Sequence, residues 1–448
     1  MRSPGLASTA RTITIEQHAS RSPAESALFY GPFALLLFGP LAFGAVEPWS
    51  IFVMETGAAL LFLLWGFRQA SGNELRISRS PVLAPMLVFA ALEFLALAGG
   101  FTAYRQATFS QALLFASYGL LCFLVVQSVR RTWQVQTLTL GLSVYGSLLA
   151  TLALLQSLTS PNKLYWLRTP HFGSWIYGPY ANHNHYAGLM EMLFPVPLVF
   201  SLTHYASGTS KMMSAFAAAM MATSIFLSGS RGGMMAFTVQ IALLAFILLQ
   251  KRKTFGVLRT LGVFATVVLA VLIWLGGGEL AQRVASIHSK TSSELSETTR
   301  LNIDRDGVKM FLQKPILGFG HGTFAETYPR FRSFYTNFLV NEAHNDYLQL
   351  LVEMGALGFA AMLWFLIVVY RGAITKLTDW PVDANGAVAL ATMLGVTGIL
   401  VHSFVDFNLQ IPANAALFYV WCAIAAMEPR FGLSRRRAKR EPGERISS

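Results

Sequence analysis

The chain has 448 residues, of which 54% are hydrophobic and only 12% are charged, and its formal net charge at pH 7 is +12. Soluble globular proteins carry about 25% charged residues, so this composition excludes an ordinary soluble protein and indicates an integral membrane protein. The first 27 residues are polar and contain no apolar segment closed by a small-residue cleavage site. We therefore expect a cytoplasmic N-terminal segment at 1–27 rather than a cleaved signal peptide.

Apolar runs of roughly 20 residues, the length needed to cross a bilayer, recur along the chain. They predict about 12 transmembrane helices, near 28–46, 50–67, 81–98, 109–128, 136–157, 185–203, 211–228, 233–250, 256–275, 346–370, 386–405 and 410–428. A long polar segment, here called the long loop (about 276–345), precedes the tenth span, and its stretch 299–311 predicts a short amphipathic helix. The predicted fold is an all-α polytopic membrane domain over 28–428, with the long loop forming a helical lid and a basic tail at 429–448.

The positive charge follows the predicted topology. With the N-terminus in the cytoplasm, the inside segments hold 22 of the 34 basic residues, and most of the other 12 lie in the long loop, which has little influence on orientation. This excess predicts cytoplasmic termini, a periplasmic long loop and a tail that contacts anionic membrane lipid. No nucleic-acid partner is expected. The two cysteines, Cys122 and Cys422, give neither a zinc spacing nor a disulfide framework.

Four polar clusters fall on the predicted outer side. They are residues 180–186, which include Asn184 and His185 at the start of the sixth span; residues 228–233; the long loop; and the end of the eleventh span, with His402 and Asp406. The inner loops carry basic residues but no comparable groups of His, Asn and Gly. The convergence of four clusters on one side predicts a functional site there.

Arg231 lies in a turn between glycines, preceded by Ser230. Glycine lets a bulky anion approach the backbone, and the planar guanidinium suits phosphate or pyrophosphate oxygens. The alternative is an arginine that merely extends from a helix end to the membrane surface.

The long loop adds Arg300 and Arg305, followed by a glycine-rich turn (315–324) that is expected to lie over the site as a lid. No lysine-serine pair follows these glycines, so the turn does not predict a nucleotide site. Either arginine is a candidate for anion binding, and the alternative is a solvated arginine.

His344 ends the long loop and is the candidate general base, since the ordinary pKa of histidine lies near the operating pH. Asn345 and Asp346 are helix-cap types, so part of this cluster is structural. Asn345, Gln349 and Glu353 recur every four residues and share one helix face, which predicts a polar surface at the water–membrane boundary. The spacing of the histidines fits no zinc pattern, so we expect no metal or other cofactor.

Three motifs resemble the bacterial O-antigen ligase and polymerase superfamily: residues 227–233, 315–320 and 343–355. The closing run 402–414 is also similar, and the resemblance covers about 175–428. It implies an inverting, metal-independent glycosyltransferase of the inner membrane, with a glycan on polyprenyl pyrophosphate as donor. In that family two arginines bind the pyrophosphate and a histidine activates the acceptor. Arg231 and Arg300 match the two arginines in this sequence, and His344 matches the histidine. Many relatives carry a tryptophan where this chain has Asp304.

The resemblance leaves three acceptors open. A polymerase would use a second lipid-linked glycan, a ligase would use lipid A-core, and related enzymes transfer the glycan to protein. Besides His344, Arg231 and Arg300 as catalytic residues, the expected substrate-binding residues are Arg305, Ser230, Asn184, His185, Asn345, Asp346, Gln349, His402 and Asp406. Alternatives from other classes are a transporter or flippase of lipid-linked sugars and a non-catalytic member of a polysaccharide assembly complex. Polysaccharide assembly proteins are also candidate partners.

Overall fold

The computed structural model describes residues 22–72, 77–129, 131–160, 162–169, 175–204, 206, 208–250, 262, 264–266, 268–270, 297–336 and 339–427. Within this part of the chain there are two isolated β-bridges but no strand. Nine helical segments of this part are long and apolar enough to cross a membrane when 183–202 is counted as one, and two shorter apolar helices accompany them. These eleven helices coincide with eleven of the predicted spans; the remaining one, 256–275, falls largely outside the described residues. The chain is an all-α, multi-pass membrane protein.

The described residues up to 228 form eight α-helices and one 3₁₀ turn. They are α1 (Pro23–Leu41), η1 (Phe43–Ala45), α2 (Pro48–Ala70), α3 (Leu83–Ala98), α4 (Arg105–Ser128), α5 (Thr132–Thr159), α6 (His183–Leu193), α7 (Pro195–Leu202) and α8 (Gly208–Ser228). The second half continues with α9 (Arg231–Leu249), α11 (Glu297–Gln313), α12 (Phe324–Thr327), η3 (Tyr328–Arg330), α13 (Asp346–Ile374), η4 (Leu377–Asp379), α14 (Ala384–His402), η5 (Asn408–Gln410) and α15 (Pro412–Ala426).

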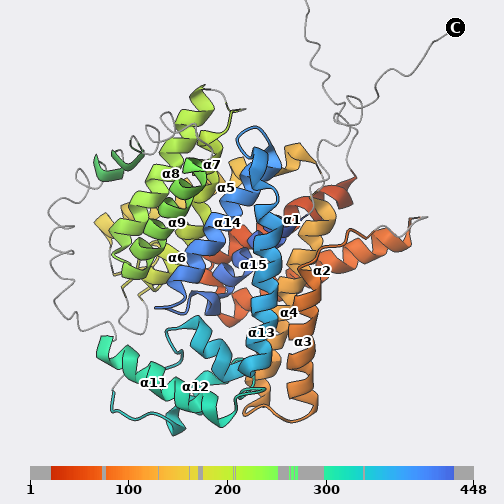
Figure 1. Ribbon diagram of the computed structural model, residues 1–448, viewed down its shortest axis with the longest axis vertical. Helices are drawn as coiled ribbons and strands as arrows, with labels where there is room; N and C mark the ends of the chain where they lie inside the picture. The colour runs from red at the N-terminus through yellow and green to blue at the C-terminus, as the bar shows by residue number, and fades with distance from the viewer. Residues whose placement is uncertain are drawn as a thin grey trace, which may run out of the picture.

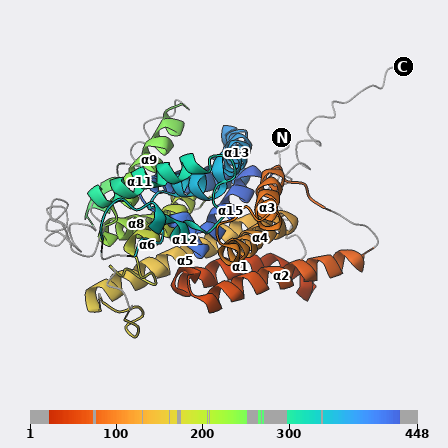
Figure 2. The ribbon, with the colours of Figure 1, turned by 90° about the horizontal axis from the view of Figure 1, so that it is seen from below.

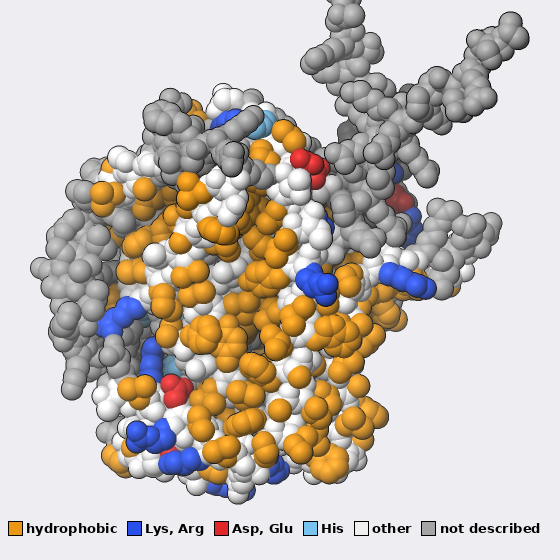
Figure 3. Space-filling view, viewed as in Figure 1, with side chains coloured by type: hydrophobic (Ala, Val, Ile, Leu, Met, Phe, Trp, Pro, Cys, Tyr) orange, Lys and Arg blue, Asp and Glu red, His pale blue; other side chains and the backbone are white. Residues whose placement is uncertain are grey.

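Helix α14 forms the centre of the bundle, where it packs against α6, α7, α9 and α15 (Figure 1). The outer helices instead expose large apolar side chains, among them Phe67, Leu148 and Phe216. Figure 3 shows hydrophobic side chains covering the middle of one face, whereas several Lys and Arg side chains lie at the end that carries α11. An apolar belt of this kind is what a lipid-facing surface requires.

Proline divides the sixth span into α6 and α7. Pro195 has no backbone N–H and its ring would clash with the preceding turn, so the regular helix ends at Leu193 and restarts at once. The short α6 is completely buried. Its first turn holds His183, Asn184 and His185, which are thereby fixed inside the bundle.

Helix α13 is interrupted at Gly355, whose φ of 62° and ψ of −167° are not helical. The glycine-rich turn enters this interruption: Phe319 N–H donates to the Val352 carbonyl at 3.0 Å and Ala356 N–H to the Pro315 carbonyl at 2.8 Å. A Cβ on Gly318 would lie 2.3 Å from the Glu353 carbonyl oxygen, so the two backbones can meet only with glycine there. Backbone groups that the broken helix leaves open are thus satisfied by the long loop.

The predicted amphipathic helix of the long loop is confirmed as α11. Its buried residues Ile303 and Met310 pack with Leu348 and Val352 of α13 in a small separate core. Seen from below, α11 runs across the end of the bundle while α13 is viewed along its axis (Figure 2). The helix therefore covers one end of the membrane domain.

Candidate active site

The four predicted polar clusters meet at the end of the bundle that carries α11. Asp346 N–H donates to the Ser403 carbonyl at 2.9 Å, which joins the start of α13 to the end of α14. The Asn414 amide donates to the His185 carbonyl at 2.9 Å, which joins α15 to α6. A Cβ on Gly232 would lie 2.4 Å from the His402 ring, so the first turn of α9 touches the same place.

Asp406 lies at the centre of this convergence. Its Oδ1 is 3.7 Å from His344 Nδ1 and 3.9 Å from His185 Nε2, and the side chain is 2% exposed. The Phe407 N–H donates to Oδ1 at 2.8 Å, and the Phe407 ring packs edge-on against both imidazoles. Burial alone would raise the pKa of Asp406, but the contact with His344 and the nearby His185 hold it well below the usual range. An ionised carboxylate between two histidines can orient a general base.

His344 is held in a strained backbone conformation. Its φ of 55° lies in the left-handed region, which costs a non-glycine residue on the order of 1–3 kcal/mol. Asn345 then caps α13, its side chain accepting a hydrogen bond from Leu348 N–H at 3.2 Å. The His344 side chain is 17% exposed, and its Nδ1 has no hydrogen-bond partner within the described residues. The imidazole is therefore held toward Asp406 while part of the ring stays accessible.

The two predicted pyrophosphate-binding arginines flank the segment that leads to Asp406. Arg300 Nη1 donates to the Val405 carbonyl at 3.0 Å, and its buried Nε lacks a hydrogen-bond partner among the residues described. Arg231 is exposed at the first turn of α9, and a Cβ on its neighbour Gly232 would lie 3.0 Å from a Val405 methyl group. Both arginine-bearing segments thus touch Val405, next to the His344–Asp406 pair.

Several other predicted residues have structural partners. Ser230 is buried and caps α9, its Oγ accepting from Gly233 N–H at 3.1 Å. His402 Nδ1 pairs with the buried Glu191 at 2.8 Å beneath that turn. Asn184 is buried in α6, whereas Arg305 is exposed on α11. These residues support or border the central cluster.

The polar face of α13 holds the long loop. Glu353 accepts hydrogen bonds from Gly322 N–H at 2.8 Å and Phe324 N–H at 3.1 Å, and Gln349 accepts from Ala343 N–H at 3.0 Å. Both side chains are buried. Gln349, expected to bind substrate, thus bonds to the long loop in the structure.

Two features were not among the predicted site residues. Asp304 lies one helical turn after Arg300 on α11; burial raises its pKa, while the charges of His344 and Arg300 oppose that rise. Its spacing of four from Arg300 was the available signal. The second feature is a close pair between His321, in the glycine-rich turn, and the buried Glu93 of α3. Residues separated by 228 positions give no local pattern that predicts such a pair.

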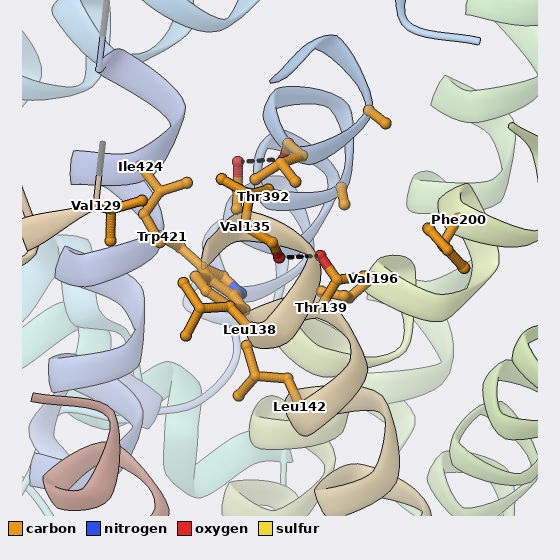
Figure 4. A pocket seen from close by; sticks show the side chains of 13 residues that line it. Val129, Val135, Leu138, Thr139, Leu142, Val196, Phe200, Thr392, Trp421 and Ile424 are labelled. Atoms are coloured by element: carbon orange, nitrogen blue, oxygen red, sulfur yellow. Dashed lines mark hydrogen bonds between the residues drawn. The ribbon is translucent and has the colours of Figure 1, made fainter. Parts of the chain in front are cut away.

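A small apolar cavity of about 40 Å³ lies elsewhere, between α5, α7, α14 and α15. Figure 4 shows Leu138, Leu142 and Trp421 facing it, with Thr139 hydrogen-bonded to its own helix. It has no ionisable side chain in its lining, so it offers no groups for acid–base chemistry.

The family model described as O-antigen ligase matches residues 216–363. A comparison with curated proteins finds no match. The matched segment runs from α8 into α13 and includes Arg231, Arg300 and His344. Residues 216–363 therefore carry an O-antigen ligase domain, which supports membership of the chain in the O-antigen ligase and polymerase superfamily.

Proposed function

We propose that the protein transfers a glycan from polyprenyl pyrophosphate to an acceptor hydroxyl at the periplasmic face of the bacterial inner membrane. Residues 1–27 and 429–448 are then cytoplasmic, and α11 covers the site from the periplasm. The observation that carries this proposal is the placement of His344 and Asp406 beside Val405, against which both arginine-bearing segments pack.

The arginines would act on the leaving group. When the bond between the anomeric carbon and the pyrophosphate oxygen breaks, the pyrophosphate keeps the electron pair and its negative charge grows. Arg231 and Arg300 supply fixed positive charge and hydrogen-bond donors at that point, so the proposed step uses no metal ion. The Arg300 Nε, which lacks a partner among the described residues, provides one such donor.

His344 would act on the acceptor. Its ring takes the hydroxyl proton as the acceptor oxygen bonds to the anomeric carbon, on the side opposite the departing pyrophosphate, which inverts the configuration. Asp406, at 3.7 Å, stabilises the imidazolium that forms. Holding both sugars in the site also removes much of the entropic barrier.

The test is transfer by the purified full-length protein in proteoliposomes supplied with a fluorescent glycan on polyprenyl pyrophosphate and a glycan acceptor. Arg231→Ala and His344→Ala should each reduce transfer by about 10²-fold or more while the protein still inserts into the membrane. Arg330→Ala, at an exposed position of the long loop outside the predicted site, is the matched control. Wild-type transfer in the Arg231 or His344 variant would overturn the proposal.

Transport is the alternative from another class, and the same proteoliposomes separate it. A flippase would move the labelled lipid between leaflets without making a new glycosidic bond. A transporter is expected to use charged side chains at membrane depth. Glu93 of α3, one of the few such residues in the first half of the chain, instead pairs with His321 of the long loop. A deletion strain separates the acceptors: loss of chain length indicates a polymerase, and finished polymer retained on carrier lipid indicates a ligase.

A further inference from the structure

The side-chain amide of Gln349, near the start of α13, is buried and bonds to three groups at once. Its Oε1 accepts a hydrogen bond from Ala343 N–H at 3.0 Å. Its Nε2 donates to a carboxyl oxygen of Glu342 and, at 3.4 Å, to Glu353 Oε1. A glutamine amide offers one oxygen acceptor and two N–H donors. Both donors and the oxygen of Gln349 are therefore engaged with its own chain.

These bonds fix the direction in which the amide faces. A rotation of the Gln349 amide by 180° would bring its N–H groups against Ala343 N–H, so that two donors would face each other. The carboxyl oxygen of Glu342 holds the Nε2 on the opposite side and favours the observed orientation. Glu342 and Ala343 are adjacent in the chain, so one amide holds the side chain of the first and the backbone of the second. Gln349 is thus a fixed acceptor for the residue immediately before His344.

The chain is anchored again directly after His344. Asn345 caps α13, its Oδ1 accepting from Leu348 N–H at 3.2 Å, and Asp346 N–H donates to the Ser403 carbonyl at 2.9 Å. His344 therefore lies between two anchored positions, 343 and 346, and it adopts a φ of 55° there. A left-handed backbone at a residue other than glycine persists only where the surrounding structure holds it.

The left-handed backbone determines where the imidazole lies. The φ torsion of His344 joins Ala343 to the His344 Cα, so it can relax to a negative value only if residue 343 or the ring moves. The ring now lies with its Nδ1 at 3.7 Å from Asp406 Oδ1. Because the bond from Ala343 N–H to Gln349 blocks movement of residue 343, loss of this bond would let the ring leave Asp406.

We propose that Gln349 is a positioning residue for His344. Glu342 orients the Gln349 amide, and the amide holds Ala343. The left-handed backbone of His344 is thereby maintained, and with it the place of the imidazole beside Asp406. The inference rests on the proposed function, in which His344 takes the proton of the acceptor. Gln349 would then contribute to transfer through the base rather than by touching the substrate.

The position of His344 can be tested without turnover by chemical labelling. The full-length protein in phosphatidylcholine nanodiscs is treated with diethyl pyrocarbonate, which acylates neutral imidazole, and the labelling rate of each histidine is measured by mass spectrometry. Gln349→Met removes the amide. Gln349→Asn keeps an amide on a side chain one methylene shorter, and it carries the test if the methionine variant does not fold.

Gln127→Met is the matched control. Gln127 is also buried, and its amide bonds to both backbone groups of Ser78, with its Oε1 accepting at 2.8 Å and its Nε2 donating at 2.9 Å. Its replacement therefore removes the same chemical group from a backbone contact outside the candidate site. The exposed His204 is the internal reference for the activity of the reagent.

We expect His344 to be labelled about threefold faster or more in both Gln349 variants, because its side chain, 17% exposed in the structure, gains accessible surface when it leaves Asp406. The control variant and the reference histidine should react at their wild-type rates. In the proteoliposome transfer assay, both Gln349 variants should lose kcat per folded protein by about tenfold or more, with the KM for the donor within about twofold of wild type, because the groups that hold the pyrophosphate are unchanged.

An unchanged labelling rate of His344 in both Gln349 variants would refute the inference, as would faster labelling without a loss of kcat. Equal acceleration in Gln127→Met would also refute it, because the effect would then come from a general loosening of the protein. Wild-type transfer by His344→Ala would instead refute the proposed function, and the labelling of His344 in the Gln349 variants would still test its position.

Discussion

Gly232→Ala tests whether the arginine turn must touch the end of α14. The added Cβ would lie 2.4 Å from His402 Cδ2 and Nε2, against an ordinary contact distance of at least 3.4 Å. His402 is 1% exposed and bound to Glu191 at 2.8 Å, so its ring cannot withdraw into solvent. The first turn of α9, which carries Arg231, must therefore move outward by about 1 Å.

The expected loss in catalysis is about as large in free energy as the expected loss in stability. Overpacking of this kind costs about 1–3 kcal/mol of folding free energy. A displacement of about 1 Å in a positioning group lowers the rate by about 10²-fold, or roughly 2.7 kcal/mol in the barrier. We expect Gly232→Ala to lose transfer by that factor while it still inserts and purifies as a folded protein.

The assay is the proteoliposome transfer rate, measured beside the thermal unfolding midpoint in detergent. Gly141→Ala is the control, because a Cβ at that position in α5 meets no atom within 4 Å. Gly232→Ala at wild-type rate would refute the reasoning, since it would mean that Arg231 works without contact between α9 and His402.

Three further predictions concern groups around the site. Asp406→Asn should lower transfer by about 10²-fold in proteoliposomes, since a neutral amide cannot stabilise the His344 imidazolium; an unchanged rate would remove Asp406 from the mechanism. Burial and the charge of Glu353 raise the pKa of Glu342 to about 8. Because the folded state then holds this proton more tightly than the unfolded chain, stability should fall as pH rises from about 4.5 to 8, by a few kcal/mol at most, and Glu342→Gln should flatten the profile of unfolding midpoint against pH. Gly318→Ala, whose Cβ would meet the Glu353 carbonyl oxygen at 2.3 Å, should release the glycine-rich turn and increase its cleavage by an added protease; wild-type resistance would contradict the contact.

The sequence predicts the membrane helices well, because each apolar run is a local signal. Helix α11 also follows from local periodicity, with Ile303 and Met310 on its buried side. The interruption of α13 was not predicted: residues 346–370 read as one apolar run, and Gly355 breaks it only because the glycine-rich turn inserts there. The local sequence of a helix does not reveal which distant segment of the chain inserts into it.

Within the candidate site, topology predicted that His344, Arg231 and Asp406 lie at one end of the bundle. It did not predict the role of Gln349. A spacing of four places Gln349 and Glu353 on one face, but the sequence does not say what covers that face, and the structure places the long loop there. In the sequence Asp304 is distinguished only as a departure from the family, because its closeness to His344 depends on how α11 packs.

The contacts between the long loop and α13 determine which part of the long loop can move away from the site. Backbone hydrogen bonds join the glycine-rich turn to the interrupted helix α13, so moving this turn away would break hydrogen bonds of a membrane span. Arg300 is tethered to Val405 only through its side chain, and that bond can exchange for a phosphate oxygen without disturbing any helix. In the proposed function, the pyrophosphate of the donor would therefore enter beside Arg300, while the glycine-rich turn stays in place.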